Sequence, residues 1–458
     1  MLSDNDRTVR REGKSGVTPL FLVTGKFGRL GRNLLGAGLL LTACVASPQS
    51  ATLSSSAGSS SADADEARLV PGDLLGKRIF EDPGLSEPPG VACASCHEAT
   101  SAYRGNNGST IPAIAKGSRA EVFGVRKTPS LGYMAYSPDF SFASLPNDVT
   151  GKLETVPVGG QFWDGRAVDQ ERQVEGPLFN PREMNLPDKA EFIRRVRASP
   201  YASLAQAVYG DTVFDDAKAF EKLASAVAGY EASPRFKPFT SKFDDWLEGR
   251  ATFTEEERRG YQAFIDPKRG NCLSCHAGGE SSEHEEKTTG QKSPLSRNPR
   301  NWLFTDFTYD VLGAPRNPAI PDNADPTHFD LGFCQRPNAD SIAPPDVNVA
   351  SLCGAFKTPS LRNVAVAGPY FHNGALATLR DAVAFYFTRD TNPERWYPRN
   401  ANGDVAKFND LPPEFWKNVN VEQPPYNRKS GETAVELDQE IDDIVAFLKT
   451  LTDKSFAR

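Results

Sequence analysis

Apolar residues recur every three or four positions over residues 220–230 and again over residues 437–451. This spacing predicts one amphipathic helix in each place. Upstream of each lies a shorter helical segment in which a glycine and an aromatic residue are one turn apart, GKRIF at 76–80 and GYQAF at 260–264. The second segment starts with a capping box, in which Thr254 is followed three residues later by Glu257. This order of segments predicts a mainly α-helical protein with an internal duplication.

Further matches follow in the same order in the two halves of the chain. TPSL at 128–131 recurs at 358–361, and FWDG at 162–165 aligns with FHNG at 371–374, so that Trp163 and His372 hold equivalent places. The second half carries a larger insert at residues 278–350, which is rich in Pro, Asn and Asp and has little helical periodicity. We expect this insert to form long loops, with WLF at 302–304 and FTY at 307–309 as short packed segments.

Each half also contains one Cys-x-x-Cys-His motif, CASCH at 93–97 and CLSCH at 272–276. Two thiols at this spacing can add to the two vinyl groups of one haem, and the next residue then places an imidazole beneath the iron. The alternatives are a thioredoxin-type thiol pair and half of a zinc site. Two copies favour two covalently bound haem c groups, with proximal iron ligands His97 and His276 and thioethers from Cys93, Cys96, Cys272 and Cys275.

The first 66 residues are predicted to lie outside the folded body. Residues 1–43 contain seven Lys or Arg against three Asp or Glu, with an apolar stretch at 34–41 followed by TAC at 42–44. This is typical of an export signal, and LTAC at 41–44 resembles a bacterial lipobox that would leave Cys44 lipidated; an ordinary signal peptide is the alternative. The apolar stretch is shorter than the ~20 residues of a membrane-spanning helix. Residues 44–66, rich in Ser and Ala, predict a flexible tether, so we expect a periplasmic protein with an N-terminal lipid anchor.

Charge and cysteine content add further limits. A net charge of −7 does not suit a protein that binds nucleic acid. Of the seven cysteines, the anchor and the two haem motifs account for all but Cys334 and Cys353. Outside the cytoplasm these two can form a disulfide, although two free thiols are the alternative. One haem motif per half predicts an N-terminal domain over residues 67–237 and a C-terminal domain over residues 238–458.

These motifs resemble those of the bacterial di-haem cytochrome c peroxidase and MauG family over essentially the whole mature chain. The family pattern FWDGR, with a Gln ten residues after the Trp and a Glu ten residues later, is matched by Trp163, Gln173 and Glu183. A second family pattern is matched by PYFHNG at 369–374. The resemblance implies two cytochrome c-like domains. It also implies that the haem of His97 reacts with hydrogen peroxide, that the haem of His276 transfers electrons, and that Trp163 lies between them.

Proton transfer at the first haem is assigned to Glu183 on the basis of this resemblance. Cleaving the O–O bond of hydrogen peroxide needs a base that takes a proton from one oxygen and an acid that returns it to the leaving oxygen, and one carboxylate can do both. Gln173 is expected to orient Glu183 or the bound peroxide. Without the family spacing, Glu183 would be interpreted as a solvated surface residue and Trp163 as a core aromatic.

The sixth iron ligands can be inferred by counting. The three methionines are Met1, Met134 and Met184, so the second half has no thioether to cap its haem as typical family peroxidases do. Fourteen residues after His372, where those peroxidases place the Met, the chain has Tyr386, as in MauG-like enzymes; an aromatic on a helix face is the alternative. A phenolate ligand favours ferric or higher iron, whereas a thioether favours ferrous iron.

The five histidines suggest that the two haems differ. In many family peroxidases a His closes the first haem in the resting state, and none lies between His97 and His276 here. The resemblance therefore implies that the first haem is open without reductive activation. His284, in the acidic run EHEE at 283–286, is expected to be a solvated surface residue, and His328 receives no role.

Two departures limit the resemblance. Many family members bind calcium between the haems through an Asn, whereas this chain has Lys127 at that position, and an ammonium group cannot ligate a cation. Calcium is therefore in doubt, although backbone carbonyls near Pro369 could still contribute. MauG also relays electrons through a surface Trp just before the second motif, where this chain has RGN at 269–271. Any relay must run elsewhere.

Together these features predict a periplasmic di-haem c-type peroxidase that uses hydrogen peroxide to form high-valent haem and to oxidise a protein partner, as MauG does. The first alternative is a cytochrome c peroxidase that detoxifies hydrogen peroxide with electrons from a small cytochrome c or cupredoxin. An alternative of another class is a di-haem electron carrier without enzymatic activity. We expect no nucleic-acid partner, and membrane contact only through the lipid anchor.

Overall fold

The computed structural model describes residue 66 and residues 68–147, 150–278, 298–428 and 437–457. The predicted export signal, Cys44, nearly all of the predicted tether and His284 lie outside these residues. Within the described part, none of the helices is both long enough and apolar enough to cross a bilayer.

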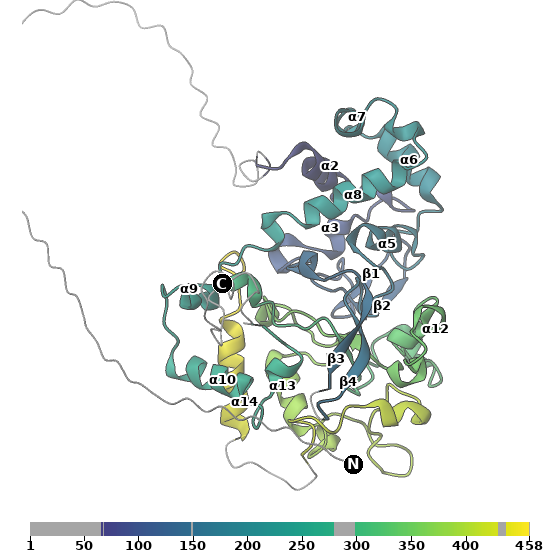
Figure 1. The fold of residues 1–458 in the computed structure, drawn as a ribbon. Helices are drawn as coiled ribbons and strands as arrows, with labels where there is room; N and C mark the ends of the chain where they lie inside the picture. Colours follow the sequence, from purple (N-terminus) through teal and green to yellow (C-terminus); the bar gives the residue numbers. More distant parts are fainter. Residues whose placement is uncertain (1–65, 67, 148–149, 279–297, 429–436, 458) are drawn as a thin grey trace, which may run out of the picture. The chain divides into compact units, whose positions relative to one another are not determined.

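Helices dominate the folded part, which confirms the predicted mainly α-helical class (Figure 1). The first half holds α2 (Pro71–Phe80), α3 (Cys93–Cys96), α4 (Gln170–Gln173), α5 (Glu175–Phe179), α6 (Lys189–Ala198), α7 (Ala202–Tyr209) and α8 (Ala219–Glu231). The second half holds α9 (Lys242–Leu247), α10 (Glu255–Ile265), α12 (Ala339–Ile342), α13 (Leu379–Thr388) and α14 (Leu437–Lys449). Sheet structure among the described residues consists of three antiparallel pairs: β1 (Ile114–Lys116) with β2 (Phe123–Lys127), β3 (Ser141–Pro146) with β4 (Leu153–Val158), and β5 (Tyr309–Asp310) with β6 (Phe356–Lys357).

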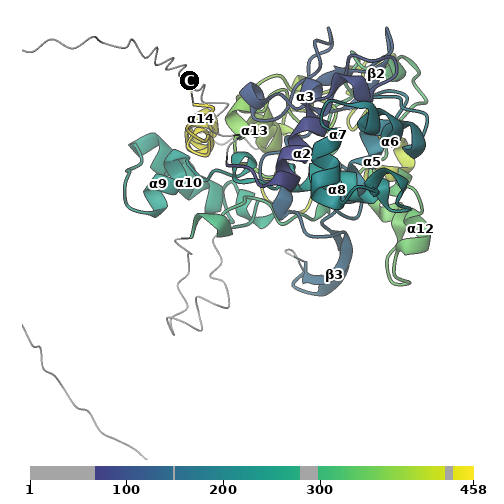
Figure 2. The same ribbon diagram turned by 90° about the horizontal axis from the view of Figure 1, so that it is seen from above.

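Two helix pairs organise the two halves, and all four helices were predicted from the sequence. Helix α2 packs on α8, and α10 packs on α14 (Figures 1 and 2). A glycine lies at each contact: a Cβ on Gly76 would lie 1.9 Å from the carbonyl oxygen of Ala226, and a Cβ on Gly260 would lie 1.8 Å from that of Asp443. Only a residue without a Cβ allows backbones to approach this closely.

Side-chain caps define where the helices that carry the site begin. The hydroxyl of Thr254 accepts a bond from the backbone N–H of Glu257 at 3.2 Å, which confirms the predicted capping box of α10. Asp169 caps α4 in the same manner, and Thr378 caps α13. These caps satisfy backbone donors that the helix itself leaves free.

The core forms two apolar clusters, one in each half of the chain. The first includes Leu75, Phe192 and Leu223, and the second includes Phe264, Phe304, Phe385 and Phe447. Each half also contributes to the other cluster. Phe140 and Phe142 on β3 pack against the second cluster, and Phe456 near the C-terminus packs against the first. The two halves therefore interlock across a shared contact.

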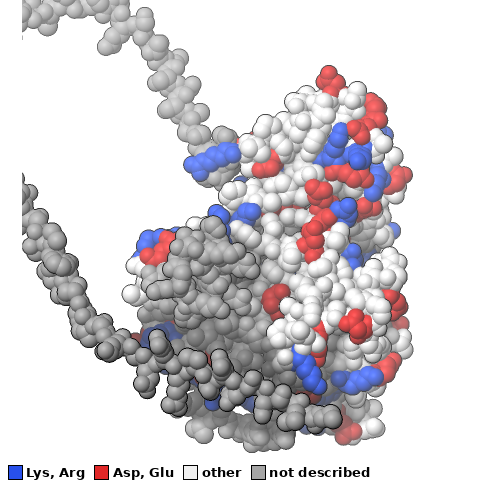
Figure 3. Space-filling model, viewed as in Figure 1, with Lys and Arg blue, Asp and Glu red and all other residues white. Residues whose placement is uncertain are grey.

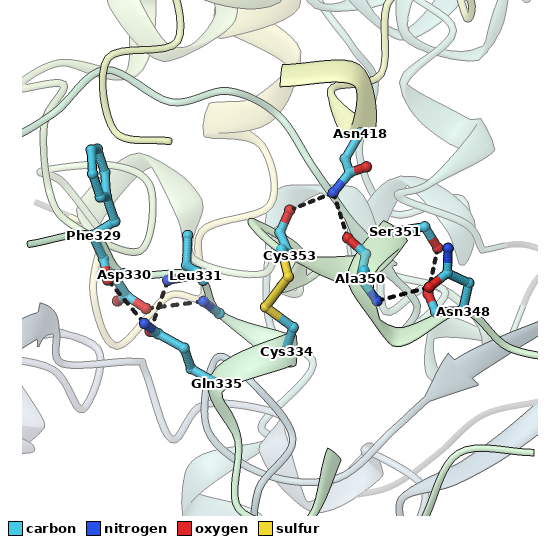
Figure 4. The surroundings of a disulfide bond; sticks show 11 residues. Phe329, Asp330, Leu331, Cys334, Gln335, Asn348, Ala350, Ser351, Cys353 and Asn418 are labelled. Atoms are coloured by element: carbon cyan, nitrogen blue, oxygen red, sulfur yellow. Dashed lines mark hydrogen bonds between the residues drawn. A yellow bond between two sulfur atoms is a disulfide. The ribbon is translucent and has the colours of Figure 1, made fainter. Parts of the chain in front are cut away.

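The described part of the insert is mostly loops and short turns, as predicted, and its regular elements are the short strand β5 and the single-turn helix α12. Its segments WLF and FTY are packed: the side chains of Trp302 and Phe304 are fully buried. A disulfide joins Cys334 to Cys353, with 4.9 Å between the Cα atoms (Figure 4). The side-chain amide of Asn418 donates to the backbone carbonyl of Cys353 at 3.2 Å, which connects the disulfide to the C-terminal part of the chain.

Charged side chains of both signs are interspersed over the described surface in the view of Figure 3. Many of them form local ion pairs, such as Arg194 with Glu191 at 2.6 Å and Lys242 with Glu257 at 2.7 Å. Exposed pairs of this kind contribute little stability individually.

Candidate functional site

The two Cys-x-x-Cys-His motifs adopt matching local geometry. The ring Nδ1 of His97 lies 3.0 Å from the carbonyl oxygen of Tyr103, and that of His276 lies 3.1 Å from the carbonyl oxygen of Phe304. Because Nδ1–H donates to a carbonyl, the other ring nitrogen is left with a free lone pair, which is the usual arrangement of a metal-binding histidine. Burial lowers the pKa of both rings to about 4, so both are neutral at physiological pH.

A cavity of about 660 Å³ connects the two motifs. Its walls are formed by residues from both halves, and they include every residue predicted to hold haem: Cys93, Cys96, His97, Cys272, Cys275, His276 and Tyr386. None of the four motif cysteines takes part in a disulfide. Thiols and neutral imidazoles on the walls of one apolar cavity suit covalently attached haem, and the residues present therefore fit the groups that the motifs predict.

Trp163 lies where the two halves meet and lines this cavity. Its indole N–H donates to the backbone carbonyl of Lys127 at 2.8 Å, and its own carbonyl accepts from the backbone N–H of Lys357 at 2.8 Å. In the second half, the backbone carbonyl of His372 accepts from the backbone N–H of Lys127 at 2.7 Å. Trp163 and His372 thus make corresponding contacts, each with the lysine that precedes the Thr-Pro-Ser-Leu segment of the opposite half.

Glu183 and Gln173 line this cavity, and Glu183 is near enough to Cys93 and Cys96 for its charge to raise the pKa of both thiols. Glu183 Oε1 accepts from the side-chain amide of Asn180 at 2.5 Å. Burial raises the pKa of this carboxyl, while Asn180 and the nearby Arg166 oppose the shift. Gln173 is the last residue of α4, whose cap at Asp169 fixes the start of that helix. Glu183 is therefore half-buried beside the cavity and does not behave as a solvated surface residue.

Tyr386 lies on α13 and lines the same cavity as the second motif. Burial is the main cause of the raised pKa of its phenol, and the thiols of Cys275 and Cys272 raise it further, so the phenol lies close to both cysteines. Its ring stacks on that of Tyr426 with 5.5 Å between centroids. The structure brings Tyr386, His276 and both cysteines together on one part of the wall.

Several residues of the cavity wall were missed in the sequence analysis. Met134 and Met184 both line this cavity, so two thioethers from the first half, not considered as ligands from the sequence, are present on its wall. Glu231, the last residue of α8, is a buried carboxyl whose pKa is raised to about 7 by burial, with Gln170 as its hydrogen-bond partner at 3.2 Å. No sequence pattern marks Glu231, because the apolar period of α8 predicts only which residues face the core.

The residues near the expected calcium position also form direct contacts. The Lys127 ammonium donates to the carbonyl oxygen of Ala367 at 2.5 Å. Arg126 donates to Asp164 at 2.6 Å and to Asp330 of the insert at 2.6 Å, and all three side chains are largely buried. This network ties the FWDGR segment to the insert.

Comparison with known proteins agrees with these motifs. Residues 72–252 match the family model described as di-haem cytochrome c peroxidase. The methylamine utilization protein MauG of Paracoccus denitrificans is 35% identical over 405 residues, which cover 86% of this chain and 92% of that protein. The chain belongs to the di-haem cytochrome c peroxidase and MauG family. Membership makes it an oxidoreductase of the peroxidase type and implies two haem c groups.

Other relatives include both peroxidases and MauG proteins. The cytochrome c551 peroxidase of Nitrosomonas europaea is 28% identical over 313 residues, covering 68% of this chain and 70% of that protein. Among solved structures, the diheme peroxidase BthA from Burkholderia thailandensis matches with a TM-score of 0.73 and 38% identity over 84% of this chain and 86% of that chain. A MauG-like protein associated with microbial copper homeostasis shares the fold, with a TM-score of 0.53 at 24% identity over 86% of this chain and 94% of that chain.

Proposed function

We propose that hydrogen peroxide reacts at the haem of the first motif, that the haem of the second motif carries Tyr386 as its sixth ligand, and that the oxidising power is used on a protein partner. The observation that carries this proposal is the position of Tyr386 beside Cys272 and Cys275, in the cavity that also reaches His97. Each haem, when bound, supplies an iron that exchanges electrons. One haem belongs to each of the domains 67–237 and 238–458.

Glu183 handles the proton in the peroxide reaction. Reduction of one hydrogen peroxide to two waters consumes two electrons and two protons, and the O–O bond breaks more easily when the leaving oxygen is protonated. The pKa of Glu183 is raised by burial, which brings this carboxyl closer to the pH at which it can both accept and return a proton. Gln173 lines the same wall and orients Glu183 or the peroxide.

Trp163 couples the two haem sites. Hydrogen bonds at its indole N–H and at its carbonyl hold it between Lys127 and Lys357, so the ring is fixed at the contact between the halves. A ring held rigidly at this place provides a short and constant path for electrons between the two parts of the cavity.

Tyrosine ligation supports oxidation of a protein partner over turnover with a small electron donor. A phenolate donates charge to iron and disfavours the ferrous state, so a haem capped by Tyr386 is a poor acceptor for electrons from a high-potential cytochrome. The partner then supplies the two electrons from its own Trp or Tyr side chains. The similarity to MauG over 92% of that protein agrees with this function, whereas the cytochrome c551 peroxidase relative favours peroxide detoxification as the second candidate.

We also propose that the chain is exported and is held at a membrane by a lipid on Cys44. The support is the basic, then apolar, N-terminal sequence that ends in LTAC. Haem attachment to Cys-x-x-Cys-His outside the cytoplasm agrees with this location.

Peroxide addition to the ferric holoprotein tests the proposed function. One equivalent of hydrogen peroxide, added without an electron donor, should change the absorption of both haems, and the changed spectrum should persist. Reduced small cytochrome c should then be oxidised slowly by the wild type and faster by Tyr386→Met, which restores a thioether. Rapid turnover of cytochrome c by the wild type would establish the detoxifying peroxidase instead. An unchanged spectrum would contradict any peroxidase.

A further inference from the structure

Two neighbouring basic side chains on the cavity wall, Lys127 and Arg104, form no ion pair. Lys127, on β2, is buried, and its ammonium donates only to the neutral carbonyl of Ala367. Arg104 also lines the cavity, and its buried Nε has no hydrogen-bond partner. The two are near enough that the positive charge of Arg104 helps to lower the pKa of Lys127, although burial is the larger cause. Lys127 is buried with no carboxylate that acts on it, and the half-buried Arg104 has only Glu98 nearby, outside ion-pair distance. Such cations are unfavourable unless a ligand supplies the opposite charge.

The other arginines on the cavity wall each form an ion pair with a carboxylate. Arg126 pairs with Asp164 and Asp330, Arg166 with Asp164, Arg182 with Asp322, and Arg362 with Asp244. The carboxylate that acts on Arg104 is Glu98, which forms no ion pair with it. Lys357, the matching lysine of the second half, has Asp164 nearby. Lys127 thus differs from these cations in having no carboxylate that acts on it, and Arg104 differs from the other four arginines in having none within ion-pair distance.

The position of the pair indicates which anion it would meet. Arg104 directly follows Tyr103, whose carbonyl oxygen holds His97, so it is tied to the first haem motif by the chain itself. The Lys127 ammonium lies 5.7 Å from the ring centroid of Tyr370, and the phenol of the same residue is near enough to Arg104 to influence its pKa. A haem has two carboxylates, its propionates, on the edge away from the vinyl groups.

We propose that Arg104 and Lys127 together bind the propionate carboxylates of the haem attached to the first motif. This inference rests on the proposed haem site at Cys93, Cys96 and His97. It gives Lys127 a role as a fixed cation where the family pattern has an amide. It also connects the propionates to Trp163, because the Lys127 carbonyl holds the indole N–H.

A redox titration of the holoprotein, followed by the absorbance of each haem over a range of pH, tests the proposal. Removing a cation beside a propionate favours the ferric state and the protonated carboxyl. We therefore expect Lys127→Met and Arg104→Gln to make the reduction potential of the first haem more negative and to move its pH-dependent step to higher pH. Arg104→Lys, which keeps the charge, should behave like the wild type. The exposed Lys152 provides a matched control, since Lys152→Met removes the same charge outside the cavity.

Two results would overturn the assignment. In the first, the reduction potential of the first haem and the pH at which it changes are the same in Lys127→Met and Arg104→Gln as in Lys152→Met. If Lys127→Met does not fold, Arg104→Gln decides alone, because no hydrogen bond at Nε is lost there. The other is a spectral change when acetate is added to the wild type but not to Lys127→Met, which would show that the site takes a free anion. The mass of each variant reports whether the first haem is attached, so a failure of the haem site itself is recognised separately.

Discussion

Replacing Gly76 by alanine should destabilise the protein through the contact between α2 and α8. The new Cβ would lie 1.9 Å from the carbonyl oxygen of Ala226 and 2.9 Å from the Cβ of Tyr230, whereas ordinary contacts begin at 3.4 Å. The helices would have to separate by about 1.5 Å, and overpacking of this kind costs about 1–3 kcal/mol. The obstacle is backbone and cannot rotate away, so we take the upper end of that range. Better helix propensity returns about 1 kcal/mol, which leaves a net loss of about 2 kcal/mol in the free energy of unfolding.

Gly72 in the same helix is the matched control for this substitution. A Cβ on Gly72 would meet nothing within 4 Å. Gly72→Ala should therefore keep or raise the free energy of unfolding, by up to about 1 kcal/mol. Urea unfolding of the holoprotein, followed by far-ultraviolet circular dichroism and by haem absorbance, measures both variants. Equal midpoints for Gly76→Ala and Gly72→Ala would refute the close approach of the two helices.

Four further predictions concern the site and its support. Glu183→Gln should slow the reaction with hydrogen peroxide by about 10²–10⁴-fold in stopped-flow measurements; in the wild type the rate should rise with pH through a pKa above the usual 4.5, and the variant should lose this rise. Tyr386→Phe should change the low-spin signal of the second haem in electron paramagnetic resonance. Tyr426→Phe keeps the stacked ring and the Tyr386 ligand, so it should leave that signal unchanged. Because the folded pKa of Glu231, about 7, exceeds its usual 4.5, the folded state holds this proton more tightly; the free energy of unfolding should fall as pH rises from 4.5 to 7, and less so in Glu231→Gln. Replacing Cys334 and Cys353 by serine should cost about 3 kcal/mol in that free energy without changing either haem spectrum.

Much of the fold could be predicted because the sequence repeats its own signals. The apolar periods of α8 and α14, the capping box at Thr254 and the two glycines at the helix contacts are local features, and each has a direct structural cause. The equivalence of Trp163 and His372 could be proposed from alignment of the two halves. That each of them contacts a lysine of the opposite half could not, since it depends on how the halves pack.

The chemistry of the cavity was only partly predictable for the same reason. Residue types and spacing brought His97 and His276 forward as candidates, and the family resemblance added Glu183 and Tyr386. All four lie on the wall of one cavity. Charge balance is different, because a sequence does not show which cation lacks a partner. Arg104 could be distinguished from the paired arginines only when their carboxylates were located in the structure. Glu231 was missed because it is the last residue of α8, and its burial depends on how that end of the helix packs.

The central claim is that the first haem is open and the second is closed by Tyr386. Electron paramagnetic resonance of the resting ferric holoprotein tests this claim most directly, with Met134→Leu and Met184→Leu as variants that remove the two thioethers of the cavity wall. The account predicts one high-spin and one low-spin haem in the wild type, with the high-spin signal unchanged in both methionine variants. Two low-spin signals in the wild type would contradict it.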